Sequence, residues 1–390
     1  MANEKNKEKS GEKETKKTVR TFALASFFND MGSDMIYPIW PLFVTAVLNA
    51  NMAILGLIDG LGDAIVSISQ AASGYVSDRT RKRKVFIWTG YVFGSLSRIG
   101  YAFSTVWEHL IPFRVLDRAG KMRGAPRDAM IADASTKENR GRNFGLLRAM
   151  DNLGAFVGII ICILLVSLIG YRELFLIAAI PSVIAVILIL LVIKEKKPAE
   201  SKIYKGFSFR GMDKNFRLFM VLSAIFALGS FSYSFLLIYA TKFGFQPVFV
   251  PVLYMIFTFA AFLFSLPFGK LADKIGRKPV MMISFAFWSL VCASFILSQS
   301  YVAVILTFVF YGMHRGALEP VQKTFVSELS PEKYRASGLG AYQMVIGLCA
   351  LPSSLAAGFL WDAYGMFVPL YLSLGLTVVS LALLAFVREK

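Results

Sequence analysis

Five aspartates in the first half of the chain could take up and release protons. Asp30 and Asp34 are four residues apart, as are Asp59 and Asp63, and Asp151 is a fifth candidate. A spacing of four places both carboxylates of a pair on one face of a helix. A carboxylate buried away from water can take up a proton near neutral pH, unless nearby arginines keep it ionised. These acids are therefore candidates for a proton relay.

Basic residues that could balance these acids lie in the segment 107–130. Arg114, Asp117 and Lys121 follow one another at i,i+3 and i,i+4 spacing and could neutralise each other along one helix face. Arg118 is a further charge on this segment. An unpaired charge at bilayer depth costs at least about 2.5 kcal/mol, so these groups must face protein or water. The sequence leaves open whether they relay protons or form a static lattice of salt bridges.

The second half of the chain has fewer charges inside its apolar segments. The candidates there are His314, which could titrate near neutral pH, and Arg315 and Glu319, whose spacing permits a local ion pair. We therefore expect the proton chemistry in the first half of the chain. In the second half we expect a more apolar, aromatic wall at which a substrate could bind. The candidates for that wall are Phe226, Phe231, Tyr233, Phe235, Tyr254, Phe257 and Phe259.

The elements that must position these side chains are membrane-spanning helices. Hydrophobic residues make up 56% of the 390 residues, phenylalanine occurs 35 times, and the mean hydropathy is +0.59. Apolar stretches of roughly 20 residues recur, which is the length of an α-helix that crosses a bilayer. We predict an all-α membrane protein with twelve spanning helices, at 20–48, 52–77, 84–104, 107–130, 141–169, 172–193, 216–241, 247–271, 279–298, 301–326, 335–361 and 365–387.

The chain is also an internal duplication. Gly74 to Lys84 reads GYVSDRTRKRK, and 195 residues later Gly269 to Pro279 reads GKLADKIGRKP. A fixed internal period of this kind indicates repeated structural units. We predict two pseudo-symmetric six-helix bundles, with this organisation: a disordered cytoplasmic tail at 1–18, the first bundle at 19–193, a cytoplasmic linker at 194–215 and the second bundle at 216–390.

The net charge of +17 reflects membrane topology rather than a nucleic-acid partner. Of the 42 Lys and Arg, 35 fall on one side of a twelve-helix zigzag, whereas only Arg172 and Lys242 fall on the other. Because cytoplasmic loops carry the excess of positive charge, we expect both termini in the cytoplasm and the protein in the cell (inner) membrane, in contact with lipid.

Taken together, the duplication and the glycine-aspartate motif resemble a permease of the major facilitator superfamily, with some likeness to prokaryotic drug-exporter-like members. The resemblance implies two bundles that rock around a central cavity, with a cytoplasmic gate at each copy of the motif. Small glycines there would let a neighbouring helix approach closely. The gate residues that it implies are Gly74, Asp78 and Arg79 in the first copy and Gly269, Asp273 and Arg277 in the second.

The chain departs from the family pattern at several positions. Arg81 stands where the second copy has Gly276. Arg114 fits the arginine that the family carries near its coupling site, but Asp117 and Arg118 replace the usual glutamine and glycine. The stretch 154–159 has the glycine spacing of the family's antiporters without their proline, and small residues at that spacing also suit simple helix packing.

We therefore expect a secondary active transporter, not an enzyme, that exports a small organic solute in exchange for protons, as a monomer and without cofactor or metal. Uptake by proton symport or by uniport is the alternative. Gly60-Leu61-Gly62-Asp63 matches a signature of intramembrane aspartyl proteases, but the partner Tyr-Asp dipeptide is absent from the sequence. A receptor or scaffold would leave the buried charges unexplained.

Overall fold

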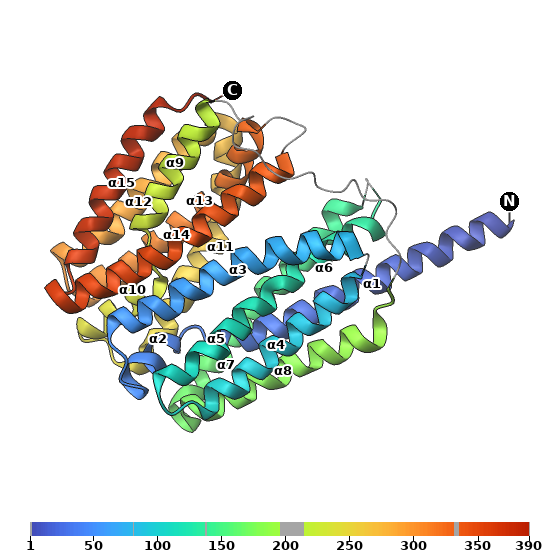
Figure 1. Cartoon of the computed structure of the whole chain (residues 1–390), viewed down its shortest axis with the longest axis horizontal. Helices are drawn as coiled ribbons and strands as arrows, with labels where there is room; N and C mark the ends of the chain where they lie inside the picture. Colours follow the sequence, from blue (N-terminus) through green and yellow to red (C-terminus); the bar gives the residue numbers. More distant parts are fainter. Residues whose placement is uncertain (1, 81, 137–138, 196–213, 331–334, 390) are drawn as a thin grey trace. The chain divides into compact units, whose positions relative to one another are not determined.

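Every regular element in the computed structural model is helical (Figure 1), across the residues that it describes, 2–80, 82–136, 139–195, 214–330 and 335–389. The predicted all-α class is therefore confirmed. The main helices are α1 (Ala2–Asp34), α2 (Trp40–Leu42), α3 (Met52–Thr80), α4 (Arg83–Phe103), α5 (Leu110–Ala119), α6 (Gly124–Ala134), α7 (Arg140–Ile169), α8 (Tyr171–Val192), α9 (Lys214–Gly229), α10 (Tyr233–Lys242), α11 (Val250–Ile275), α12 (Arg277–Leu297), α13 (Tyr301–Leu329), α14 (Arg335–Tyr364) and α15 (Val368–Phe386). Short turns of other helix types lie at Phe43–Val47, Trp107–His109, Gly120–Arg123 and Pro247–Phe249.

Nine helical segments in the described part of the chain are long and apolar enough to cross a membrane. They correspond to nine of the twelve predicted spans. The other three predicted spans contain α1 with α2, α4, and α5 with α6. Two of these three are interrupted helices and all three carry buried charged side chains, which lowers their hydropathy.

The chain folds into two compact units. The first unit comprises Met1–Ile39 and Ile68–Tyr204, and the second comprises Trp40–Ser67 and Lys205–Lys390. The prediction differs for residues 40–67, which it placed in the first bundle (19–193) and not with the second (216–390). Most of the predicted linker, 194–215, lies outside the described residues. A continuous helix, α3, is thus divided between the units.

Close backbone packing explains why the first part of α3 belongs to the second unit. A Cβ atom added at Gly56 would lie 2.7 Å from the carbonyl carbon of Ser354 on α14, and one at Gly60 would lie 2.7 Å from Leu351 Cα. Such distances leave no room for a side chain. Gly60, the first residue of the protease-like signature, therefore has a packing role here.

The amino-terminal segment differs from the prediction. Residues 2–18, predicted as a disordered tail, are the first part of α1. Lysine and glutamate, which dominate this segment, are good helix formers, and the helix continues without a break into the apolar part of α1.

Prolines explain why two predicted spans are interrupted. The span 20–48 is helical only to Asp34 and resumes at Trp40, because Pro38 cannot donate to the carbonyl of residue 34 and its ring clashes with that turn. In the span 107–130, Pro126 leaves the carbonyl of Met122 without its usual helical donor. The hydroxyl of Ser73 on α3 donates to that carbonyl at 2.7 Å.

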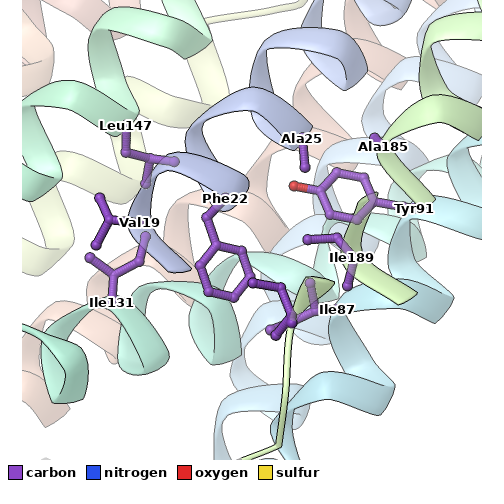
Figure 2. Packing of buried hydrophobic residues seen from close by; sticks show 10 residues of the cluster. Val19, Phe22, Ala25, Ile87, Tyr91, Ile131, Leu147, Ala185 and Ile189 are labelled. Atoms are coloured by element: carbon purple, nitrogen blue, oxygen red, sulfur yellow. The ribbon is translucent and has the colours of Figure 1, made fainter. Parts of the chain in front are cut away.

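The first unit has an apolar core where α1, α4, α6, α7 and α8 meet (Figure 2). The phenyl ring of Phe22 and the phenol ring of Tyr91 lie among aliphatic side chains in this view. The buried members are Val19, Phe22, Ala25, Ile87, Tyr91, Ile131, Leu147, Ala185, Ile189 and Ile193. This core fixes α1 and α4 as the rigid supports of the charged residues described next.

Candidate functional site

The structure divides the predicted coupling residues between the two units. Asp30, Asp34, Arg114, Asp117, Arg118 and Asp151 belong to the first unit, whereas Asp59, Asp63, His314, Arg315 and Glu319 belong to the second. The aspartate pairs of the first half, grouped in the prediction as one set, therefore belong to different units. The two groups are described separately.

In the first unit, Asp117 is the acid with the densest basic surroundings. Its side chain is buried, and the Arg118 Nε atom lies 3.7 Å from its carboxylate. Arg114, which is only 2% exposed, and Lys121 are also close enough to interact with its charge. Arg118 in addition lies over the ring of Tyr37, 5.2 Å from its centre, a cation–π contact. The predicted electrostatic grouping on this segment is thus present, with Arg118 as the nearest partner.

Arg98 on α4 is a buried charge that the sequence analysis did not select. It is 2% exposed and donates hydrogen bonds to the backbone carbonyls of Ala178, at 3.1 Å, and Asn29, at 3.0 Å. It also donates to the Ser33 hydroxyl at 2.7 Å. One guanidinium therefore ties α4 to α1 and α8. Its neighbours are distant in sequence, so spacing could not have revealed this role.

A second group of charges in this unit contains Asp151 and Arg127. Asp151 on α7 lies 3.3 Å from Arg148 and 4.0 Å from Arg127, both measured to guanidinium nitrogens. Arg127 also pairs with Asp128 at 3.0 Å and donates to the Ser26 hydroxyl of α1 at 2.6 Å. Asp30 accepts from the neighbouring Asn29 amide at 2.9 Å and interacts electrostatically with Arg127 and Asp151. Asp34 is buried at the end of α1.

In the second unit, Asp59 accepts hydrogen bonds from two neutral side chains. It is 2% exposed and accepts from the Trp40 indole N–H at 2.9 Å and from the Ser232 hydroxyl at 2.7 Å. Asp63, one turn further along α3, is exposed. Trp40 and Ser232 are partners that the sequence analysis missed, because neither residue type is ionisable.

His314 and its two charged neighbours on α13 have different surroundings. His314 is 1% exposed, and its Nδ1 atom lies 2.8 Å from the backbone carbonyl oxygen of Ser284 on α12. Because that carbonyl can only accept, we assign the proton to Nδ1. Arg315 and Glu319 form the predicted i,i+4 ion pair, and both side chains are about half exposed.

Several residues of the predicted aromatic wall form one cluster within the second unit. The ring of Tyr233 lies 5.4 Å from that of Tyr254, and Phe257 links Tyr254, at 4.7 Å, to Tyr311, at 5.1 Å. Edge-to-face and tilted contacts of this kind stabilise aromatic clusters. Phe226, Phe231 and Phe235 are buried in other ring contacts of this unit, whereas Phe259 is 53% exposed.

In the first copy of the gate motif, Arg83 is the central residue. Its guanidinium donates to Asp78 at 2.9 Å and to Asp133 at the end of α6. The backbone N–H groups of Arg83 and Lys84 both donate to the carboxylate of Glu195, at 2.8 Å each, which caps the first turn of α4. Arg79, the predicted gate residue, instead lies 3.3 Å from the Tyr75 hydroxyl.

The second copy repeats this arrangement residue by residue. The guanidinium of Arg277 lies 3.0 Å from Asp273 and 3.1 Å from Glu328. The backbone N–H groups of Arg277 and Lys278 donate to Glu389, as those of Arg83 and Lys84 donate to Glu195. The offset between the bridging arginines is therefore 194, one less than between the motif glycines.

This offset corrects the comparison of Arg81 with Gly276. Gly276, whose φ angle is +99°, precedes the first residue of α12, and Lys82 precedes the first residue of α4. Arg81 is thus the extra residue of the first copy, and it lies outside the described residues. The offset of 194 between Arg83-Lys84 and Arg277-Lys278 was the signal in the sequence that could have identified Arg83.

The motif glycines do not make the close contacts expected of them. A Cβ atom at Gly74 would lie 3.5 Å from Ala125 Cβ, an ordinary van der Waals distance, and one at Gly269 would meet no described atom within 4 Å. In this structure, the aspartates of the motif pair with their arginine partners, and neither glycine is required for a close helix contact among the described residues.

The bridging arginines can be tested against Arg79. We expect R83Q and R277Q to lower the free energy of unfolding by similar amounts, about 1 kcal/mol, because their acidic partners are partly exposed and screened by water. The measurement is thermal unfolding of the purified protein in detergent. R79Q is the control, and a loss of stability in R79Q as large as in R83Q would show that the assignment of Arg83 is wrong.

Metal binding has no support among the described residues, where no group of three or more His, Cys, Asp and Glu side chains could hold an ion. Cys162 and Cys292 are buried, with the Cys292 thiol 3.6 Å from the Ser373 hydroxyl, and Cys349 is partly buried.

Comparison with known proteins identifies the family of this chain. The family model of the Major Facilitator Superfamily matches residues 22–233 and 217–390. An uncharacterized MFS-type transporter of Methanocaldococcus jannaschii is 36% identical over 98% of each chain. Among solved structures, a mutant of the nucleoside transporter NupG superposes with a TM-score of 0.80 at 16% identity, covering 95% of this chain and 100% of that one. A D-xylose-proton symporter superposes with a TM-score of 0.73 at 15% identity, covering 96% and 97%. The chain therefore belongs to the Major Facilitator Superfamily of multi-pass membrane transporters.

Proposed function

We propose that the protein moves a small organic solute across the cytoplasmic membrane by alternating access, and that it exports this solute in exchange for protons. The observation that carries the proposal is the burial of charged side chains, among them Arg98, Arg114 and Asp117, within the helices of the first unit. Ionised groups at membrane depth cost several kcal/mol in insertion and typically mark ion or substrate pathways. We further propose that the protein works as a monomer with both termini in the cytoplasm.

The hydrogen bonds of two of these acids are compatible with proton uptake. Asp59 accepts from an indole and a hydroxyl, and Asp30 accepts from an amide and lies close enough to Arg127 and Asp151 to interact with their charges. Burial of a carboxylate favours its protonated form. Asp117, with its arginines, is a better candidate for the lattice. We therefore propose Asp30 and Asp59 as proton sites and Arg114 and Arg118 as electrostatic partners within the first unit.

Uptake in symport with protons is the second candidate. The D-xylose-proton symporter has the same fold, and its name describes coupling in the opposite direction. The glycines at 154 and 158 on α7 do not distinguish export from uptake, because both pack against α1. What favours export is the likeness of the sequence to exporters within the family, and a transport assay measures the direction.

The solute that we propose has an apolar, planar part. The cluster of Tyr233, Tyr254, Phe257 and Tyr311 would offer ring faces and hydroxyl groups to such a molecule. Nucleosides are one such class, in line with the nucleoside transporter of the same fold. A thermal-shift screen with uridine, xylose and ethidium as probes would identify the class, since a ligand that binds the folded state raises its unfolding temperature.

The proton coupling can be tested with the probe that this screen selects. In proteoliposomes, we expect an imposed pH gradient to drive transport, and D30N and D59N each to reduce the gradient-driven rate about tenfold or more, equivalent to about 1.4 kcal/mol. E108Q, outside the candidate residues, is the control. Transport that is unchanged when the gradient is collapsed would contradict proton coupling, and the direction of movement distinguishes export from uptake.

A further inference from the structure

The start of α3 is capped by a carboxylate from another helix, α14. The first two backbone N–H groups of α3, those of Met52 and Ala53, donate to Asp362 Oδ1 at 3.2 Å and to Asp362 Oδ2 at 2.8 Å. The third is satisfied within α3 itself, because the side-chain oxygen of Asn51 accepts from Ile54 N–H at 2.9 Å. All of these residues belong to the second unit. The start of the helix is thus held partly by its own N-cap residue and partly by α14.

Next to this cap, α3 and α14 pack backbone to backbone. Gly56 and Gly60 of α3 leave no room for a side chain against α14. Gly358 of α14 does the same against α3, since a Cβ atom there would lie 2.6 Å from Ala53 Cα. Asp362 follows Gly358 by one helical turn. Its hydrogen bonds therefore lie at the end of a close seam between the two helices, the α3–α14 seam.

The duplicated helix, α11, starts without such a cap. At the offset of 195 between the motif glycines, Met52 corresponds to Pro247, the first residue of the apolar segment that contains α11. Proline has no backbone N–H to donate. Among the described residues, neither the short turn that begins at Pro247 nor α11 itself has a side-chain cap. A copy of the same helix thus folds without a carboxylate at its start, so the repeated fold does not require the contact that Asp362 makes.

Asp362 binds the end of α3 that is opposite to the gate motif. α3 runs from Met52 to Thr80 and carries Asp78 of the motif in its last turn. In the predicted topology the motif lies in the cytoplasm, so the start of α3 lies on the outer side of the membrane. Each end of this helix therefore has an aspartate contact: Asp78 pairs with Arg83 at the cytoplasmic end, and Asp362 caps the outer end.

The contact at the outer end is of a kind that can be made and broken. Asp362 is exposed, so water can replace its carboxylate at the two N–H groups. A carboxylate at a helix N-terminus is attracted by the partial positive charge there, and this attraction is modest at an exposed position. An interaction of this size can shift an equilibrium between two conformations without locking the protein in one of them.

We propose that Asp362 is a positioning residue that holds the start of α3 on α14 in one conformation of the transporter and releases it in the other. The inference rests on the proposed alternating access. By the internal duplication, α3 belongs to the first six-helix repeat and α14 to the second. A movement of one repeat against the other therefore parts the outer end of the α3–α14 seam, and loss of the Asp362 charge favours the conformation in which that end is open.

Two spin labels on the outer side can measure this equilibrium. We would attach them to E108C, between α4 and α5, and to Q299C, between α12 and α13, in a variant whose three native cysteines are replaced. Double electron–electron resonance in detergent should give two distances in the otherwise unchanged protein, one for each conformation. D362N keeps the shape of the side chain and removes its charge. We expect it to raise the ratio of the longer to the shorter distance about threefold.

Two further variants separate this role from a general weakening of the helix start. N51A removes the side-chain cap that lies within α3, so it should lower the unfolding temperature without changing the distance ratio. D362E retains a carboxylate and should bring the ratio back toward that of the unchanged protein. The proposal is overturned if D362N leaves the ratio unchanged, or if N51A changes it as much as D362N does. A single distance in every variant would instead contradict alternating access, and this proposal with it.

Discussion

Replacing Asp117 with asparagine should destabilise the protein by about 3–5 kcal/mol, the typical effect of removing one partner from a buried ion pair. Asp117 is the acid next to Arg118 and close to the fully buried Arg114. The variant would keep the shape of the side chain and remove a negative charge that lies beside these buried arginines. Thermal unfolding in detergent and the yield of folded protein in membranes are the measurements.

A second variant separates a structural role of Asp117 from a role in transport. In the double variant D117N/R118Q, both members of the nearest pair are neutral, and we expect most of the lost stability to return. If transport returns as well, Asp117 belongs to a static lattice. If stability returns and gradient-driven transport does not, Asp117 takes part in coupling. E108Q, at an exposed glutamate, is the control and should change stability by no more than about 0.5 kcal/mol.

Adding a single methyl group at Gly154 or Gly158 should have an effect of similar size. A Cβ atom at Gly154 would overlap the carbonyl oxygen of Phe27 and lie 2.9 Å from its carbonyl carbon, and one at Gly158 would meet Met31 on the next turn of α1 in the same way. The obstructing atoms are backbone, which cannot rotate away. We expect G154A and G158A each to cost about 3 kcal/mol, the upper part of the usual range for overpacking.

The same helix provides a matched control. A Cβ atom at Gly145, also on α7, would meet no described atom within 4 Å. G145A should therefore be neutral or stabilising, by up to about 1 kcal/mol, because alanine favours helix more than glycine does. Thermal unfolding of the three variants side by side is the measurement. If G154A proves as stable as G145A, α1 and α7 are not packed backbone to backbone.

The gate motif shows which side-chain partners can be predicted from positions in the sequence and which cannot. The family resemblance implied Asp78 and Asp273 as gate residues, and both aspartates bind an arginine in the structure. In the first copy the resemblance implied Arg79, whereas Arg83, at the start of α4, makes the contact. Two residues separate α3 from α4, whereas one separates α11 from α12, and this difference in spacing changes which side chain reaches the aspartate.

The sequence by itself determined that this protein lies in a membrane, that it is helical, that it is internally duplicated and which family it resembles. Hydropathy and helix length follow from residues that are neighbours in the chain, and so do local pairs such as Arg315 with Glu319. The tertiary structure alone decided which distant side chains meet. It placed Trp40 and Ser232 on Asp59, and it assigned the first part of α3 to the second unit. Contacts between helices depend on the rotation and axial register of each helix. Glycine contacts and proline breaks set these in three dimensions, and the spacing of residues along one helix does not encode them.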